Sequence, residues 1–441
     1  MDHLCSGRAY PVTRTHVLLY CVAAAVRVAY LIAGAPPFDQ GYQWFVADNV
    51  VRHGFIGMDG RATSMYDPAY PMFVAFGRWL TGDTLVAIQL LQLAIDATGA
   101  VLLCVLTQIL TGNRRAAVIA GGLYAVYPLL VHHAVAGDEL SLLSVLLLAF
   151  AVLAIPPAGT SRAAMAGLCL GLAVLTRSMV GPLLLLAPGL LLFRRRPAAA
   201  CAMTTAALLV MLPWLIWSSR VSGTIWPTRS GENLLRSNSR YSADVLPAYN
   251  IDVLGEWAES MIARERPDLM ARFSDGSLYF DLSRSRDVNQ FFTALAWEEL
   301  RSRPGEILGL KARNVAYFFW PRLVPVRITG PDTQVILAPD GTLRVEGTAP
   351  RPVAQEIAYS TSYVVIAVAA LGGIWLRRRR LRDDALLWAI AVVFVAAAVV
   401  YFPATRYRVP MEFVLLFYAA VGIAALAARR RIPYNPHQWP D

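Results

Sequence analysis

The sequence predicts an all-α polytopic membrane protein, and three observations lead to this fold class. Hydrophobic residues make up 56% of the 441 residues, above the roughly 45–50% of ordinary soluble domains. About ten apolar runs along the chain approach the length of a helix that crosses a bilayer. Arginine clusters separate many of these runs, as is typical of membrane-protein loops. We therefore expect about ten or more transmembrane helices, with a loop domain on the outer face.

The composition also excludes several classes of protein. The formal net charge is +10, but the basic clusters lie between apolar runs, where they indicate topology, so we expect no nucleic-acid partner. The chain shows neither the glycine fingerprint of a Rossmann fold nor a P-loop. All five cysteines lie in the N-terminal tail or in apolar runs, and we expect neither a structural disulfide nor a cysteine-based zinc site.

The first apolar run is His16–Ala35. Ala33-Gly34-Ala35 has the form of a signal-peptidase site, but the following Pro36 is a poor cleavage context, so we interpret the run as a retained span. Arg27 lies in its middle, and Asp96 lies in the middle of the next run, Thr84–Thr111. Consecutive spans are antiparallel, and a charge at that depth normally pairs. The sequence therefore predicts a buried ion pair between Arg27 and Asp96.

Eight further apolar runs complete the expected bundle, and two of them are short for a full crossing. The short runs flank Thr176-Arg177-Ser178, and a polar break between short helices is tolerated where it lines a cavity, so Arg177 is a cavity candidate. The further runs are Arg115–His132, Glu139–Ile155, Ala163–Leu175, Val180–Phe193, Ala198–Trp217, Ile357–Leu376, Ala385–Phe402 and Val409–Ala428.

The polar intervals suggest four parts of the chain. Residues 1–217 form an N-terminal transmembrane bundle whose first outer loop is 36–83, and residues 218–356 form a mixed loop domain outside the membrane. Residues 357–428 are C-terminal transmembrane helices, and 429–441 form a cytoplasmic tail. Within the loop domain, Asn289–Arg303 and Gly305–Trp320 are expected to be helices on the membrane surface, separated by Pro304.

The arginine clusters predict the orientation. Threading the spans alternately places four clusters on one side together with the N-terminal tail: Arg114–Arg115, Arg194–Arg196, Arg377–Arg380 and Arg429–Arg431. By the positive-inside rule this side is cytoplasmic, so both termini are cytoplasmic. We expect a bacterial inner (plasma) membrane protein whose polar groups of interest all lie on the periplasmic or extracellular face.

The first outer loop is the expected centre of the chemistry. Asp39 follows the first span directly and is the candidate catalytic base, although it could instead cap a helix that starts at Gln40. Arg61 and Tyr70 in the same loop are candidate substrate-binding residues, and Tyr70 could equally be an interfacial anchor. Sugar transfer from a lipid phosphate needs a base for the acceptor proton and arginines for the departing phosphate, but no general acid.

Several short motifs, in order along most of the chain, resemble the GT-C superfamily of polyprenyl-phosphate-sugar glycosyltransferases, in particular the protein O-mannosyltransferase and aminoarabinose-transferase type (glycosyltransferase family 39-like). They are Arg27-Val28-Ala29-Tyr30-Leu31, Asp39 with Tyr42 and Ala47, Asp67-Pro68-Ala69-Tyr70-Pro71, Ala125-Val126-Tyr127-Pro128, Gly137-Asp138-Glu139-Leu140, Leu175-Thr176-Arg177, Gly231-Glu232-Asn233-Leu234-Leu235 and Arg406-Tyr407-Arg408-Val409-Pro410.

The resemblance implies an inverting transferase that takes its sugar from a polyprenyl-phosphate donor. The family's catalytic acid maps onto Asp39, although Gln40 stands where many relatives have a second acid. Asp138 or Glu139 corresponds to another acidic residue near the site. The phosphate-facing arginines would be Arg177 and either Arg406 or Arg408. The acceptor hydroxyl can belong to a glycan, a lipid or a protein.

A divalent metal and two other functions are the alternatives. His132 and His133 precede Asp138 and Glu139, but adjacent residues on a helix point about 100° apart, so no metal site is predicted. Arg27 and Asp96 would also suit the pathway of a transporter or lipid flippase, yet the chain lacks the internal repeats of many transporters. A silent assembly partner in cell-envelope synthesis is the third possibility.

Overall fold

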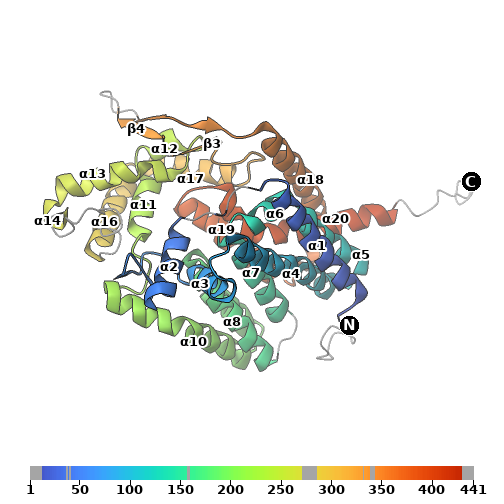
Figure 1. Cartoon of the computed structure of the whole chain (residues 1–441). Coiled ribbons are helices and arrows are strands. Elements are labelled where there is room, and N and C mark those ends of the chain that lie inside the picture. The colour runs from blue at the N-terminus through green and yellow to red at the C-terminus, as the bar shows by residue number, and fades with distance from the viewer. Residues whose placement is uncertain are drawn as a thin grey trace, which may run out of the picture.

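A computed structural model describes residues 12–35, 38, 41–155, 159–270, 286–330, 332–337 and 343–429, and Figure 1 shows the arrangement of its elements. The fold is predominantly helical, and each predicted apolar run contains a helix. The bundle helices are α1 (Arg14–Ile32), α4 (Leu85–Thr111), α5 (Arg114–Val126), α6 (Pro128–Val135), α7 (Leu140–Ala154), α8 (Thr160–Thr176), α9 (Leu183–Phe193), α10 (Pro197–Ser222), α18 (Val353–Arg377), α19 (Ala385–Val400) and α20 (Glu412–Arg429).

Among the described residues, fewer helices than expected are long and apolar enough to span a membrane. Within the described ranges, five helices are long and apolar enough to cross a membrane, and α5 with α6, bent by 51°, would make a sixth. By this measure α7, α8, α9 and α19 are shorter apolar helices. The chain is therefore a multi-pass membrane protein, but a count of ten or more spans is not confirmed. Polar or proline breaks divide several runs into pieces shorter than a bilayer is thick.

The bundle helices pack as a continuous series. Neighbours in this series are α9, α10, α8, α7, α4, α5, α20 and α18, while α1 lies against α4 and α5 and α19 lies against α9. Small residues allow close approach where α8 meets α10: a Cβ atom added to Gly167 would lie 2.1 Å from the Met203 carbonyl oxygen. A large apolar core runs through these helices.

A second group of elements covers one end of the bundle. Helices α11, α13 and α16 share a small apolar core of their own, and Figure 1 shows them with α14 on the side away from α1 and α5. In the part of the chain that the structure describes, the α-helices outside the bundle are α2 (Tyr42–His53), α3 (Ala69–Thr81), α11 (Ser230–Asn238), α12 (Ser242–Val245), α13 (Gly255–Glu265), α14 (Pro267–Met270), α16 (Arg286–Ser302) and α17 (Pro304–Phe318). The helices predicted on either side of Pro304 are α16 and α17, and α17 packs on α19.

Three short antiparallel strand pairs complete the described part of the fold. β1 (Gly57–Met58) pairs with β2 (Arg61–Ala62) in the first outer loop. β3 (Arg327–Ile328) pairs with β6 (Ala349–Pro350), and β4 (Gln334–Leu337) pairs with β5 (Leu343–Glu346). The last two pairs lie in the segment that leads from α17 to α18, so the chain crosses the covering layer before it re-enters the bundle.

Several of the arginine-rich helix ends meet at one end of the bundle. Arg194 donates to the carbonyl oxygen of Arg382 at 2.8 Å, and Arg377 donates to that of Leu110 at 3.3 Å. α10 begins at this end, directly after Arg196, and α19 begins there as well. Both helices finish beside the covering layer described above. Arg194 and Arg377, from two of the predicted arginine clusters, therefore lie at the same end of the bundle.

The ion pair predicted between Arg27 and Asp96 is confirmed. Arg27 Nη2 lies 2.5 Å from Asp96 Oδ2, and both side chains are almost completely buried. Arg27 Nη1 also donates to the carbonyl oxygen of Ala125, at the break between α5 and α6. Asp96 accepts further hydrogen bonds from Tyr124 and Ser141. One charge pair thus joins α1, α4, α5 and α7.

Removal of either partner should destabilise the protein strongly, because the remaining charge would be buried without compensation. We expect Arg27→Ala and Asp96→Ala each to cost about 3–5 kcal/mol, and the measurements are accumulation in the membrane and thermal unfolding of the purified protein. Arg52→Ala is the control, since the Arg52 side chain is 68% exposed in its pair with Asp48 and such pairs contribute about 0–1 kcal/mol. Normal accumulation and unfolding of both buried-site variants would contradict this role.

Candidate active site at the end of the bundle

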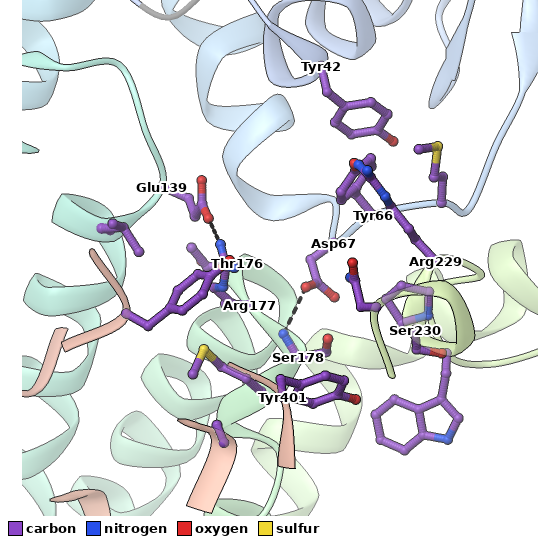
Figure 2. A pocket seen from close by; sticks show the side chains of 18 of the residues that line it. Tyr42, Tyr66, Asp67, Glu139, Thr176, Arg177, Ser178, Arg229, Ser230 and Tyr401 are labelled. Atoms are coloured by element: carbon purple, nitrogen blue, oxygen red, sulfur yellow. Dashed lines mark hydrogen bonds and ion pairs between the residues drawn. The ribbon is translucent and has the colours of Figure 1, made fainter. Parts of the chain in front are cut away.

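A pocket of about 680 Å³ lies between the end of the bundle and the covering helices. Segments far apart in the sequence form its wall: the first outer loop, the α6–α7 connection, the break after α8, α11 and the α19–α20 connection. Figure 2 shows side chains from these segments converging on one space. Most of the motifs on which the family resemblance rests contribute a residue to this wall.

The break after α8 supplies the first of these groups. α8 ends at Thr176, Arg177 adopts an extended conformation, and a 3-10 turn, η2 (Ser178–Val180), follows. The predicted polar break is therefore confirmed, and Arg177 lines the pocket as expected. Its Nη1 forms an ion pair with Glu139, and its guanidinium lies 4.6 Å from the centre of the Tyr407 ring.

Asp67 occupies the pocket between this break and α11, as Figure 2 shows. Its Oδ2 accepts a hydrogen bond of 2.8 Å from the backbone N–H of Ser178, a donor that the interruption of α8 makes available. Burial raises the pKa of Asp67 to about 6, although Ser178 and the charge of Arg177 oppose the shift. A carboxyl group that titrates near neutral pH is suited to acid–base chemistry.

The α6–α7 connection brings both of its acidic residues to the wall. Asp138 Oδ2 lies 2.5 Å from His133 Nδ1, and its other oxygen accepts from the N–H of Leu140 at 3.1 Å. Burial acts to raise the pKa of Asp138, but His133 and the hydrogen bonds outweigh it and the pKa is lowered. Gly137 has φ +77°, and a Cβ atom there would lie 2.6 Å from the Phe38 ring. Asp138 therefore both accepts a hydrogen bond from the first residue of α7 and lines the pocket.

Arg406 and Asp252 form the opposite part of the wall. Arg406 Nη2 lies 3.8 Å from Asp252 Oδ2 and donates to the Tyr407 hydroxyl at 3.0 Å. Asp252 also lies 3.3 Å from Arg236 Nη1. Burial alone would raise the pKa of Asp252, but Arg236, Arg406 and Arg229 lower it below its ordinary value. Asp252 consequently stays ionised at neutral pH.

The α11 segment adds groups that the sequence did not single out. Arg229 lies over the Tyr66 ring at 5.3 Å and forms an ion pair with Glu232 at 3.4 Å. Asn233 accepts a hydrogen bond from Arg236. Asn289 of α16 also lines the pocket and accepts a hydrogen bond from the N–H of Gly231. The Gly231–Leu235 motif marked this segment, but nothing in the local pattern distinguished Arg229 from the many surface arginines.

Three predicted site residues lie away from the pocket wall. Arg408 is completely buried, paired with Glu412 at 2.6 Å and bonded to the carbonyl oxygen of Phe318, so of the two alternatives it is Arg406 that lines the pocket. Tyr70 is buried and donates to Gln92 at 2.6 Å. Arg61 is exposed on β2. None of these three belongs to the lining of this pocket.

Asp39 lies outside the described residues, whereas Phe38 and residues 41–155 are described. Phe38 packs in an apolar cluster with Ala47 and Tyr70, and Tyr42 and Gln43 line the pocket. α2 begins at Tyr42 with Gly41 at its N-cap position, rather than at Gln40. The alternative role expected for Asp39, as the N-cap of this helix, therefore belongs to Gly41.

The arrangement combines arginines for an anion with a carboxyl group that can exchange a proton. Within the described ranges, no group of three or more His, Cys, Asp or Glu side chains could hold a metal ion. Glu139 and Asp252 form ion pairs with Arg177 and Arg236. Asp67 accepts a backbone hydrogen bond but forms no ion pair with another described residue. The pocket can therefore bind a phosphate beside a titratable carboxyl group.

The raised pKa of Asp67 predicts a pH-dependent stability. The folded protein holds this proton more tightly than the unfolded chain, so stability is lost as the pH rises from about 4 to about 6. Asp67→Asn cannot ionise, and its melting temperature relative to wild type should rise over this range and stay constant above it. Thermal unfolding at pH 4 to 8 measures this difference.

Asp83→Asn is the control for this measurement, because the hydrogen bond from Arg78 lowers the pKa of Asp83. Its melting temperature should fall relative to wild type, or stay unchanged, as the pH rises. A difference between Asp67→Asn and wild type that is independent of pH would contradict the assignment.

Comparisons with known proteins reveal similarity in structure but not in sequence. No protein-family model matches the chain, and no curated protein matches it in sequence. The oligosaccharyltransferase AglB of Archaeoglobus fulgidus, solved with an inhibitory peptide and a dolichol-phosphate, aligns over 97% of this chain and 52% of its own, with a TM-score of 0.53 and 13% identity. An Archaeoglobus fulgidus oligosaccharyltransferase solved with zinc and sulfate aligns over 94% of this chain and 49% of its own, with a TM-score of 0.54 and 13% identity.

A weaker match is ArnT from Cupriavidus metallidurans, solved with undecaprenyl phosphate, which aligns over 94% of this chain and 79% of its own at 18% identity. Its TM-score of 0.41 does not by itself establish a shared fold. The present chain spans about half the length of AglB. The AglB alignments extend over nearly the whole chain, and the chain therefore shares the fold of about half of AglB.

Proposed function

We propose that this protein is an inverting glycosyltransferase that moves a sugar from a polyprenyl-phosphate donor to an acceptor hydroxyl on the outer face of the membrane. The observation that carries the proposal is the pocket itself: two arginines, Arg177 and Arg406, and the titratable carboxyl group of Asp67 meet at the end of an apolar bundle. A donor with a long lipid and a phosphate would place its tail along the bundle and its charge against the arginines. The dolichol-phosphate bound to AglB is consistent with this donor class.

The proposed reaction follows from the groups in the wall. A carboxylate takes the proton of the acceptor hydroxyl, whose oxygen attacks the anomeric carbon as the bond from that carbon to the phosphate oxygen breaks. Inversion results because the acceptor attacks from the side opposite the leaving group. Arg177 and Arg406 stabilise the departing polyprenyl phosphate through charge-assisted hydrogen bonds, an effect worth roughly 3–4 kcal/mol per well-placed donor.

We propose Asp39 as the base. Its sequence neighbours support this role: Phe38 packs against Gly137, next to Asp138 in the wall, and Tyr42 lines the pocket. Asp67 is the second candidate, because it lies in the pocket without a recorded ion pair among the described residues. Asp138 and Glu139 orient the site through His133 and Arg177.

The transporter and flippase alternative loses its main support. Arg27 and Asp96 suggested a charged pathway, but they are buried against each other and lie outside the lining of the pocket. Their role in joining four helices accounts for both charges. A silent assembly partner would not need a pocket in which arginines and a titratable carboxyl group meet. Assays of transfer and of lipid movement distinguish all three functions.

Asp39→Asn should abolish sugar transfer while the protein remains in the membrane at its normal level. The assay uses purified protein in lipid, radiolabelled polyprenyl-phosphate sugars and a cell-envelope extract as the source of acceptors. Label that enters the extract with wild type but not with Asp39→Asn establishes the reaction, the donor and the base. Substantial transfer by Asp39→Asn, with its loss in Asp67→Asn, would assign the base to Asp67.

Two further variants complete this assay. Asp59→Asn is the matched control, because it removes a carboxylate of the same loop that does not line the pocket, and it should transfer normally. Lipid movement in the absence of an acceptor tests the flippase function directly. No transfer from any donor by folded wild-type protein would contradict the proposed activity.

We further propose that the arginine-rich end is cytoplasmic and the pocket faces the periplasm or the exterior, in the inner (plasma) membrane. In a cysteine-free variant, a cysteine in place of the exposed Arg61 should react with a membrane-impermeant maleimide in intact cells or spheroplasts. A cysteine in place of the exposed Arg379 should react only after permeabilisation. The reverse pattern would place the pocket on the cytoplasmic side.

A further inference from the structure

One aromatic ring contacts two of the three arginines among the described residues that line the pocket, Arg177 and Arg406. The Arg177 guanidinium lies 4.6 Å from the centre of the Tyr407 ring, and the Arg406 guanidinium lies 5.0 Å from it. Arg406 also donates to the Tyr407 hydroxyl. The two arginines come from distant parts of the chain, the break after α8 and the turn before α20, and Tyr407 itself lines the pocket. The ring therefore connects two cations that no shared element holds together.

The remaining contacts of the two arginines are with carboxylates. Glu139 pairs with Arg177 through Nη1, and Asp252 lies near Nη2 of Arg406. A guanidinium has five N–H groups in a planar fork, so each arginine keeps donors beyond these recorded contacts. Both side chains face the same space, where an anion can accept hydrogen bonds from both.

Two like charges in a partly buried pocket repel each other, and flexible arginine side chains lose freedom when a ligand orders them. The face of an aromatic ring attracts a cation, and more strongly where water is excluded. A ring in contact with both guanidinium groups offsets part of their repulsion and restricts their positions before a ligand binds.

We propose that Tyr407 is a positioning residue that sets the spacing of Arg177 and Arg406, so that together they bind the single phosphate group of a lipid-linked donor. This inference rests on the proposed function and assigns the phosphate subsite within it. The phosphate bonds to the arginines, and Tyr407 acts through them. The phenol ring is the essential part of Tyr407, while its hydroxyl adds one hydrogen bond to Arg406.

The test measures binding of undecaprenyl phosphate and of undecaprenol, which lacks the phosphate, to the purified full-length chain in lipid nanodiscs. Tyr407→Leu should weaken undecaprenyl phosphate binding about tenfold or more, because both cation–π contacts are lost. Tyr407→Phe keeps the ring and should stay within about threefold of wild type, since only a hydrogen bond is lost. Undecaprenol binding should be unchanged in both variants.

Tyr401→Leu is the matched control. Tyr401 lines the same pocket. The guanidinium groups of Arg177 and Arg406 lie over the Tyr407 ring, not over that of Tyr401. This variant removes a similar aromatic side chain from the same wall and should keep the preference for phosphate. Thermal unfolding of each variant verifies folding, because Tyr407 also packs on Phe402. Should Tyr407→Leu fail to fold, Tyr407→Met, which keeps a large apolar side chain without a ring, takes its place.

The outcomes separate this inference from the proposed function. If wild type binds undecaprenol as tightly as undecaprenyl phosphate, the proposed donor class is wrong. If wild type prefers the phosphate and folded Tyr407→Leu or Tyr407→Met keeps that preference, the role of Tyr407 is overturned. An equal loss in Tyr407→Phe would assign the effect to the hydroxyl and overturn the role of the ring. Loss in Tyr407→Leu with recovery in Tyr407→Phe supports the proposal.

Discussion

The Arg27–Asp96 ion pair is the interaction on which the N-terminal half of the bundle depends. An apolar interior cannot solvate a charge, so each partner requires the other at the same depth. The pair also forms hydrogen bonds with the Tyr124 and Ser141 hydroxyls and with the carbonyl oxygen of Ala125. These bonds fix four helices relative to one another. Because Asp138 lies just before α7, the position of α7 in the bundle also determines where Asp138 and its neighbours lie.

Two similar pairs hold the C-terminal helices. Arg377 binds Asp384 through two nitrogens, and Tyr418 donates to the same carboxylate. Arg408 and Glu412 are fully buried against each other. In each case the charges are compensated inside the protein and are therefore not available to a ligand. The arginines of the pocket wall differ from these buried pairs, because they contact carboxylates and also face the pocket.

Interruption of helices is what makes the pocket possible. A continuous α8 would have its backbone hydrogen bonds satisfied internally, whereas the break at Arg177 releases the N–H of Ser178 toward Asp67. The same break turns Arg177 out of the helix and toward Tyr407. The bend at Pro128 likewise redirects the chain before Asp138. These helices are therefore too short to span a membrane by themselves, and their interrupted ends supply polar groups of the site.

The sequence predicted some residues of the pocket wall correctly but could not separate close neighbours. Asp138, Glu139 and Arg177 were predicted at the pocket and line it. Arg406 and Arg408 could not be distinguished, because both are arginines in one motif. The 3-10 turn Thr405–Met411 has about three residues per turn, so the two side chains point in different directions, Arg406 into the pocket and Arg408 into the core.

The sequence by itself determined the apolar runs, the break at Arg177, the ion pair of Arg27 with Asp96 and the distribution of arginines along the chain. These features follow from the cost of placing polar groups in lipid, which acts on each segment locally. Only the tertiary structure decided that Tyr70 is buried, that Arg229 and Asp252 join the wall, and that Asp67 has a raised pKa. Burial, pairing and pKa depend on which distant segments meet, and no local pattern encodes that meeting.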